Sequence, residues 1–229
     1  MRVAAFSDIH GNISGLKAVL AYIDELGDVD AIVAAGDLLG GGPGTEDVID
    51  ILIDRNVHVL KGNMDEVWTD FEGSIEKVPE RFHDYVYQTA AWLHERVSGP
   101  YWEFLSNLPL SKTIEIAPEH VMILCHSTPK SAWEPVCAAH ADRSILHAAY
   151  GSCDAEVIAY GHFHSHHVIP MESKLLVNVA SVGLGAEGMS ALTVVDYVGG
   201  HWAVKQYMLP YDVDEERRLM HELKVPEFK

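Results

Sequence analysis

The sequence predicts an α/β fold in which a sheet with parallel strands carries ligand-binding residues along one edge. Three observations lead to this prediction. Apolar runs alternate with segments of helical spacing in the first third of the chain, further apolar runs joined by short links fill the second half, and clusters of Asp, Asn and His follow several of these runs. A β-α-β-α-β series favours a parallel sheet with right-handed crossovers, and ligands collect where the strands of such a sheet end.

The first third of the chain holds three expected strands and two expected helices. An apolar run indicates a strand buried on both faces, whereas apolar residues three and four apart indicate one face of a helix. Gly27 ends the first helix, and a glycine-rich loop precedes Thr45, which begins the second. In chain order the elements are strand 3–6, a helix ending near 26, strand 31–35, a helix from 45 to about 56, and strand 57–60.

The middle of the chain, from residue 65 to about 108, has many aromatic residues and no strand pattern. The spacing of Phe82, Tyr85, Ala90 and Leu93 suits a helix. We therefore expect a helical insert at about 65–109, lying over the crevice, within a single domain of residues 1–229. Inserts over a rigid scaffold usually shape specificity, but nothing in this one names a base, a sugar or a peptide.

The second half is rich in expected β-strands. The link from Tyr197 to His201 contains two glycines and is typical of a hairpin, and Pro118-Glu119 marks another turn. Helices are expected at 142–150 and 214–224. The expected strands are 112–116, 121–125, 156–160, 167–169, 175–179, 192–196 and 203–208.

Composition limits the possible functions. The 229 residues are 48% hydrophobic, enough for a sizeable core. The sequence contains no run of eighteen apolar residues, so we expect no transmembrane span. The formal charge of −18 is opposite to what general nucleic-acid or anionic-membrane binding requires. A small phosphorylated partner remains compatible, because bound cations can reverse the local field.

The termini and the cysteines favour a cytoplasmic location. The N-terminal residues lack the long apolar stretch and cleavage site of a signal peptide. Cys125, Cys137 and Cys153 are odd in number and lack metal-site spacing, so we expect neither a disulfide framework nor a thiolate zinc site. The oligomeric state is left open.

Five polar clusters, each just after an apolar run, carry the functional prediction. An Asp at the end of a buried strand needs a partner that offsets its desolvation, and a pair of metal ions is the strongest one available. Two His separated by one residue at a strand end can reach two ions about 3.5–4 Å apart. The seven donors, with one shared carboxylate, predict a dinuclear metal site: Asp8, His10, Asp37, Asn63, His126, His162 and His164.

The order of these clusters resembles the calcineurin-like metallophosphoesterase superfamily, and within it the small bacterial and archaeal phosphodiesterase-like branch. That family shows D-x-H, G-D, G-N-[H/C]-[D/E], a lone H and G-H-x-H. The matching positions here are Asp8-Ile9-His10, Gly36-Asp37, Gly62-Asn63-Met64-Asp65, His126 and Gly161-His162-Phe163-His164. The match extends to about Gly185, where residues 178–183 resemble the family's N-P-G-S-V-G.

The resemblance implies a four-layer α/β/β/α sandwich of two mixed sheets with two divalent transition metal ions between them. One ion would take Asp8, His10, Asp37 and His164, and the other would take Asp37, Asn63, His126 and His162. The family commonly uses manganese, iron, nickel or zinc, and the mixed nitrogen and oxygen ligands suit those ions better than magnesium or calcium.

The implied activity is hydrolysis of phosphate esters, phosphodiesters foremost, by a hydroxide that bridges the metals. Besides Asp37 and Asn63, Asn12 lies where an N-cap of the first helix is expected, and its amide could serve either the helix or a phosphate oxygen. Asp65 could hold a ligand or water. Met64 departs from the pattern, because many relatives place there a His that is proposed to assist the leaving group. Val179 and Ala180 replace the family's Pro-Gly.

Two other readings stay open at this point. One is a protein or nucleotide phosphatase, for example acting on dinucleoside polyphosphates, although those relatives usually keep the His that Met64 replaces. The other is a non-catalytic scaffold that retains the fold and binds partners with its surface. The sequence names neither the physiological substrate nor the native metal.

Overall fold

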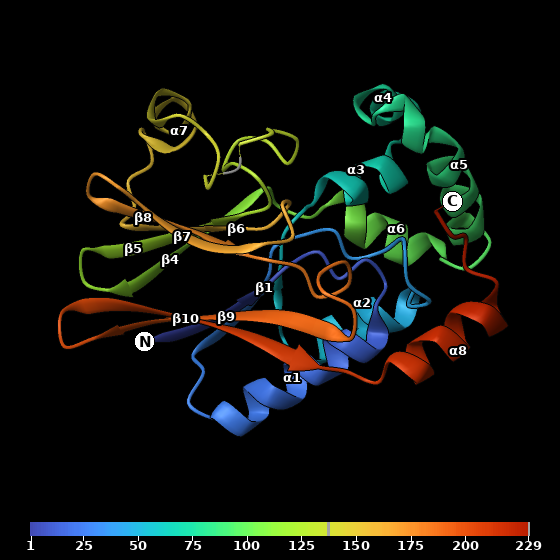
Figure 1. Ribbon diagram of the computed structural model, residues 1–229, viewed down its shortest axis with the longest axis horizontal. Coiled ribbons are helices and arrows are strands. Elements are labelled where there is room, and N and C mark those ends of the chain that lie inside the picture. Colours follow the sequence, from blue (N-terminus) through green and yellow to red (C-terminus); the bar gives the residue numbers. More distant parts are fainter. Residues whose placement is uncertain (137, 229) are drawn as a thin grey trace.

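The computed structural model describes residues 1–136 and 138–228, so Cys137 lies outside the described residues. Two five-stranded sheets pack face to face (Figure 1). The first has the strand order β10-β9-β1-β2-β3 and the second β4-β5-β6-β8-β7. The strands are β1 Arg2–Phe6, β2 Ala31–Ala34, β3 His58–Val59, β4 Ser111–Ala117, β5 His120–Cys125, β6 Val157–Tyr160, β7 His166–Met171, β8 Lys174–Val179, β9 Met189–Val198 and β10 His201–Pro210.

Both sheets are mixed. β1 is parallel to β2 and antiparallel to β9. In the second sheet β6 is parallel to β5 and β8, while β4 and β7 run antiparallel to their neighbours. The two mixed sheets confirm the expected fold class.

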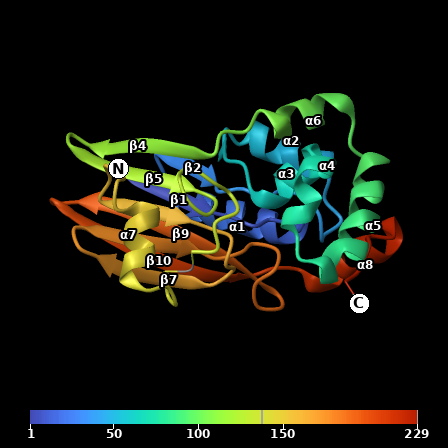
Figure 2. The ribbon, with the colours of Figure 1, turned by 90° about the horizontal axis from the view of Figure 1, so that it is seen from above.

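Helices complete the layers and form one end of the molecule. α1 and α2 cover the first sheet, α7 covers the second, and α3 to α6 lie together beside α8 at one end (Figure 2). The helices are α1 Ile13–Leu26, α2 Glu46–Asp54, α3 Asn63–Thr69, α4 Phe71–Ser74, α5 His83–His94, α6 Gly99–Ser106, α7 Arg143–Tyr150 and α8 Val213–Leu223, with 3-10 turns at Ile75–Lys77 and Glu80–Phe82. None of the helices in the described part of the chain has the length and apolarity needed to span a bilayer.

The apolar runs fold as strands because both of their faces are buried. In β1, Val3 and Ala5 face the second sheet, whereas Ala4 and Phe6 pack against the side that α1 covers. A third apolar cluster joins the outer face of the second sheet to α7 through Leu146. The resulting order of helices, sheet, sheet and helix is the expected four-layer sandwich.

The predicted elements differ from the observed ones mainly in the least apolar segments. All ten expected strands are present, but β3 has two residues where four were expected. The middle segment is helical, as expected, although its short helices α3 and α4 and its 3-10 turns carried no periodic signal. The hairpin between β9 and β10 turns through Gly199 and Gly200, both with positive φ.

A polar network joins the two sheets at the end opposite the helical insert. Glu156 Oε2 accepts a hydrogen bond of 2.8 Å from Trp202 Nε1 of the first sheet and lies 2.7 Å from His120 Nδ1 of the second. His120 Nε2 is in turn 2.5 Å from the hydroxyl of Tyr197. The hydrogen bond from His120 is the main cause that lowers the pKa of Glu156 below its ordinary value.

We expect Glu156→Gln to lower the free energy of unfolding at pH 7 by about 0.5–1 kcal/mol, a modest value because the carboxylate is partly exposed. A carboxylate whose pKa is lowered by folding stabilises the protein above the ordinary value of 4.5 and loses that contribution as the pH falls through the folded value. Urea unfolding at pH 7 and near pH 3.5 should therefore show a difference that shrinks on acidification.

Glu115→Gln, on the exposed side of β4, is the matched control. A difference between Glu156→Gln and the natural protein that is equally large at both pH values would contradict this account of the network.

Candidate metal centre

The seven predicted ligands meet at the edge where the strands of both sheets end. Asp8 and His10 follow β1, Asp37 follows β2, and Asn63 begins α3 shortly after β3. From the second sheet, His126 follows β5, and His162 and His164 follow β6. Parallel strands deliver residues from distant parts of the chain to one edge, which is why this pattern places them together.

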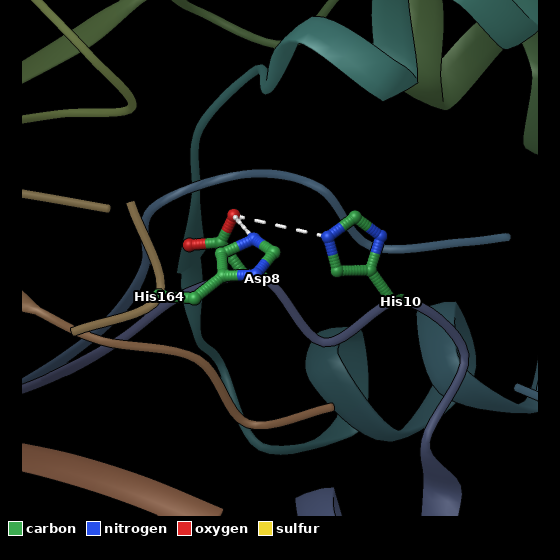
Figure 3. A group of neighbouring side chains, drawn as sticks. All are labelled: Asp8, His10 and His164. Atoms are coloured by element: carbon green, nitrogen blue, oxygen red, sulfur yellow. Dashed lines mark hydrogen bonds and ion pairs between the residues drawn. The ribbon is translucent and has the colours of Figure 1, made fainter. Parts of the chain in front are cut away.

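Two groups of side chains have ligand atoms within 4.8 Å of one another. The first contains Asp8, His10 and His164 (Figure 3), and the second contains Asp8, Asp37 and His126. Asp8 Oδ1 lies 3.1 Å from His164 Nε2, 3.9 Å from His10 Nε2 and 4.0 Å from His126 Nε2. These two buried clusters are consistent with a dinuclear metal site.

Asp37 and Asn63 lie among the same imidazoles. Asp37 Oδ2 is 3.6 Å from His10 Nε2 and 3.5 Å from His126 Nε2, so it stands between one histidine of each expected ligand set. Asn63 Oδ1 is 2.9 Å from His126 Nε2 and 2.9 Å from His162 Nδ1. The structure thus brings all seven predicted metal ligands together. The bridging role of Asp37 stays a prediction, and Asp8 is the residue common to both groups.

The carboxylates of the centre are buried without a permanent cation. Asp8 is 0% exposed and Asp37 is 2% exposed. In the described part of the chain, the ion pairs of these two residues are with histidines, and none is with lysine or arginine. Burying a carboxylate without such a partner is costly, so the site favours a bound cation.

The pKa values follow the same electrostatics. Burial alone would raise the pKa of Asp8, but the imidazoles of His126, His164 and His10 outweigh it and hold that pKa well below its usual range. Burial raises the pKa of Asp37, and the negative charge of Asp8 raises it further. Burial also lowers the pKa of His10 and of His162 to about 4, so both rings are neutral at pH 7 and have a lone pair to offer a metal.

The hydrogen bonds of the histidine nitrogens show whether the site suits a metal ion. His10 Nδ1 lies 3.2 Å from the carbonyl oxygen of Gly40, and His126 Nδ1 lies 2.7 Å from that of Ala35. Donation from Nδ1 to a carbonyl leaves Nε2 as the ligand atom, an arrangement common around metal-binding histidines. His10 Nε2 is buried and has no hydrogen-bond partner, so it faces the carboxylates with an unused lone pair. The residues fit a divalent cation.

The backbone at the centre adopts the left-handed region at residues other than glycine. Asp8, His10, Asp37, His162 and His164 have φ angles of 55°, 49°, 54°, 68° and 52°. Each such residue costs about 1 kcal/mol or more, and conformations of this kind cluster at functional sites. Five of the seven predicted ligands are held this way. Their orientation therefore lowers the free energy of unfolding, a cost that the rest of the fold offsets.

Comparison with known proteins agrees with this geometry. Residues 1–198 match the model of the calcineurin-like phosphoesterase superfamily domain. The chain belongs to this superfamily. An uncharacterized protein of Methanocaldococcus jannaschii is 24% identical over 244 residues, covering 99% of this chain and 94% of that protein.

Two solved structures share the superfamily fold along nearly the whole chain. A hypothetical protein from Pyrococcus horikoshii superposes with a TM-score of 0.84 at 20% identity, covering 99% of this chain and 94% of its own. A metallophosphoesterase from Sphaerobacter thermophilus gives a TM-score of 0.74 at 20% identity, covering 99% and 95%. At this identity the likeness concerns the fold.

Asp65, predicted to hold a ligand or water, is fully buried and bonded to the backbone instead. Its Oδ2 accepts the N–H groups of Asp37 and Gly62, and its Oδ1 accepts that of Leu38, all at 2.9 Å. Burial, followed by the charge of Asp37, raises the pKa of Asp65 to about 6. These contacts tie the loop after β2 to the loop after β3. The catalytic role suggested for Asp65 stays a prediction, and nothing in its contacts supports it.

Asn12 is the N-cap of α1. Its Oδ1 accepts the N–H of Gly15 at 2.7 Å, as expected for a cap, and this leaves Nδ2 as the amide group that can donate to a phosphate oxygen. Asn12 borders a cavity of about 210 Å³ that His10 also lines. The structure therefore places it close to the centre but outside the seven-residue cluster.

The loop after β8 supports Asp8, a role that sequence reasoning missed. Ser181 Oγ donates to the carbonyl oxygen of Asp8 at 2.8 Å, and Asn178 Nδ2 donates to that of Gly161 at 2.5 Å. Ala180 has a φ of 60°, a conformation that glycine, the residue of the family pattern at this position, can adopt without strain. The resemblance to N-P-G-S-V-G was the available signal, and the φ angle explains the glycine in it.

Three of the five ligand clusters follow a glycine that leaves no space for a side chain: Gly36, Gly62 and Gly161. A Cβ on Gly161 would collide with Ser7 Oγ and lie 2.5 Å from Asp8 Oδ2. Asp8 Oδ2 also accepts the N–H of His162 at 3.0 Å, so Gly161 is where the loops of the two sheets interlock.

We expect Gly161→Ala to weaken metal binding by at least about tenfold, since displacing a group that orients a ligand typically costs 10- to 100-fold in metal affinity. Isothermal titration with Mn²⁺ or Zn²⁺ measures the change. Gly99→Ala is the matched control, because a Cβ at Gly99 would meet nothing within 4 Å. Equal affinities of the two variants would show that the close approach at Gly161 does not position Asp8.

Proposed function

We propose that this protein is a dinuclear-metal-dependent phosphoesterase that hydrolyses small phosphodiesters. The observation that supports the proposal best is the convergence of seven nitrogen and oxygen donors. They are four imidazoles, one amide and two buried carboxylates that lack a lysine or arginine partner among the described residues. The superfamily membership gives the reaction class. The charge of −18 argues against polyanionic polymers as substrates.

The residues of the centre have distinct tasks in this proposal. Asp8, His10, Asp37 and His164 would hold one ion, and Asp37, Asn63, His126 and His162 the other. Bound there, the ions would lower the pKa of a water and neutralise charge on the phosphate oxygens. Gly40 and Ala35 hold the imidazoles of His10 and His126 in the orientation that presents Nε2 to the site.

Met64 cannot donate a proton to the leaving group. The N–H of Met64 donates to Asp37 Oδ1 at 2.7 Å, so the residue is fixed beside the centre, but its thioether carries no proton. The rate of ester cleavage should therefore depend strongly on how stable the leaving alkoxide or phenoxide is.

Exchanging Asp37 tests the metal requirement. We expect Asp37→Asn to lower kcat/KM for bis(4-nitrophenyl) phosphate by at least about 100-fold, since the charge neutralisation supplied by metal ions is worth several kcal/mol in the transition state. Asp54→Asn, an exposed change at the end of α2, should leave it unaltered. Metal content measured on each purified protein shows whether the loss of rate follows the loss of metal.

A natural protein that takes up no transition metal and shows no hydrolysis with added Mn²⁺ would overturn the proposal and favour a scaffold. Full activity of Asp37→Asn would equally exclude the proposed centre.

Leaving groups of one size test the role of Met64. For diesters of 4-nitrophenol, 4-chlorophenol and 4-methylphenol, kcat should fall as the pKa of the phenol rises. Met64→His should raise the rate with the poorest leaving group by about 10²-fold or more, the usual contribution of a general acid, and change the best one least. Rates that are independent of the phenol's pKa in the natural protein would contradict this prediction.

A further inference from the structure

An apolar cavity opens directly beside the metal centre. It has a volume of about 250 Å³, and two of the predicted ligands, His10 and Asn63, form part of its wall. The rest of the wall comes from segments distant in the sequence: the loop after β2, α3, the second 3-10 turn with the two residues before it, α5, and the loops after β5 and β8. Its principal side chains are Met64, Trp68, Val78, Phe82, Val86 and Trp133.

The cavity wall carries no lysine, arginine, aspartate or glutamate among the described residues. The indole N–H of Trp68 is already engaged, since it donates to the carbonyl oxygen of Leu39 at 3.0 Å. Two polar groups other than the metal ligands remain in the wall: the hydroxyl of Tyr85 and the indole N–H of Trp133, which is buried and has no hydrogen-bond partner in the part of the chain that the structure describes. The rest of the surface offered to a ligand is aliphatic or aromatic.

Size and polarity together restrict what the cavity can hold. An engineered apolar cavity of 150 Å³ is known to take up benzene, so about 250 Å³ accommodates one substituted ring or a branched alkyl group. A nucleobase would find only the Trp133 N–H and the Tyr85 hydroxyl as partners there, so most of its ring nitrogens and exocyclic groups would be buried unpaired, which is unfavourable. A second phosphate would meet no cation beyond the metal centre.

We infer that the substrate is a phosphate ester with an uncharged apolar substituent of about one ring in size, and that this substituent occupies the cavity while the phosphate lies at the metal centre. The inference rests on the proposed function for the position of the phosphate. It adds that Met64 has a second property besides lacking a proton: where many relatives have an imidazole, its thioether extends the apolar wall to the edge of the centre.

Two non-hydrolysable probes of equal charge test the inference. Phenylphosphonate and methylphosphonate differ only in the group that would enter the cavity. Isothermal titration of the Zn²⁺-loaded protein should show that phenylphosphonate binds about 10- to 100-fold tighter, the factor expected when one apolar ring is buried. Equal affinities would overturn the inference.

Variants of Val86 connect the difference to this cavity. Val86 is 2% exposed and forms part of the wall from α5. Val86→Phe should fill the space and remove the advantage of phenylphosphonate while leaving methylphosphonate unchanged. Val86→Ala should enlarge the space and improve binding of 1-naphthylphosphonate relative to phenylphosphonate. Ile53→Phe, on the exposed face of α2, is the control for adding a ring elsewhere.

An advantage of phenylphosphonate that survives in Val86→Phe would place the ring elsewhere and overturn the inference. If that variant does not fold, the Val86→Ala result decides: a naphthyl group that gains nothing is evidence against the cavity. Tighter binding of adenosine 5′-monophosphate than of phenylphosphonate would assign the cavity to a base and also overturn it.

A metal-free arm separates this inference from the proposed function. Trp68 and Trp133 line the cavity, so 4-nitrophenol bound there should quench tryptophan emission of chelator-treated protein, and Val86→Phe should abolish that quenching. If no phosphonate binds the metal-loaded protein, the proposed function fails. In that case, quenching that disappears in Val86→Phe would still support binding of an apolar ligand in the cavity. Absence of quenching would overturn the inference that the cavity binds such a ligand.

Discussion

The structure depends on one electrostatic constraint. Two carboxylates with almost no solvent exposure lie on neighbouring loops, among four imidazoles. Asp8 and Asp37 lie at the ends of adjacent strands of the first sheet, and the histidines opposite them come from both sheets. Such an arrangement is unfavourable without a cation. The packing of two sheets with their strand ends aligned, the glycines at the loop contacts and the left-handed backbone at the ligands all serve to hold these groups together.

The position of the centre and its ligands could be predicted from sequence because the signal is local. Each candidate ligand follows an apolar run. A strand formed by such a run delivers the residues that follow it to the sheet edge. The ten strands were recognisable for the same reason, and the largest overestimate was β3, which has two residues where four were expected. The order of the clusters then indicated the superfamily, which the match over residues 1–198 establishes.

The contacts between loops could not be predicted in this way. Asp65 accepts three backbone amides from loops that are about thirty residues apart, and no periodic pattern records such a partnership. Trp133 lies in an irregular loop, so its place in the wall of the cavity depends on tertiary packing alone. Sequence reasoning identified the candidate ligands that the structure brings together, and it missed the atoms that hold their loops in position.

The three amide hydrogen bonds of Asp65 have a consequence for how the protein acquires its ions. They fix the relative position of the two loops that carry Asp37 and Asn63 by contacts within the polypeptide, independently of any ligand. A centre that is shaped in advance in this way does not have to assemble around its cofactor. With the metal centre proposed above, one kind of ion could be exchanged for another without rebuilding these two loops, so the metal bound in a cell would reflect supply as much as intrinsic preference.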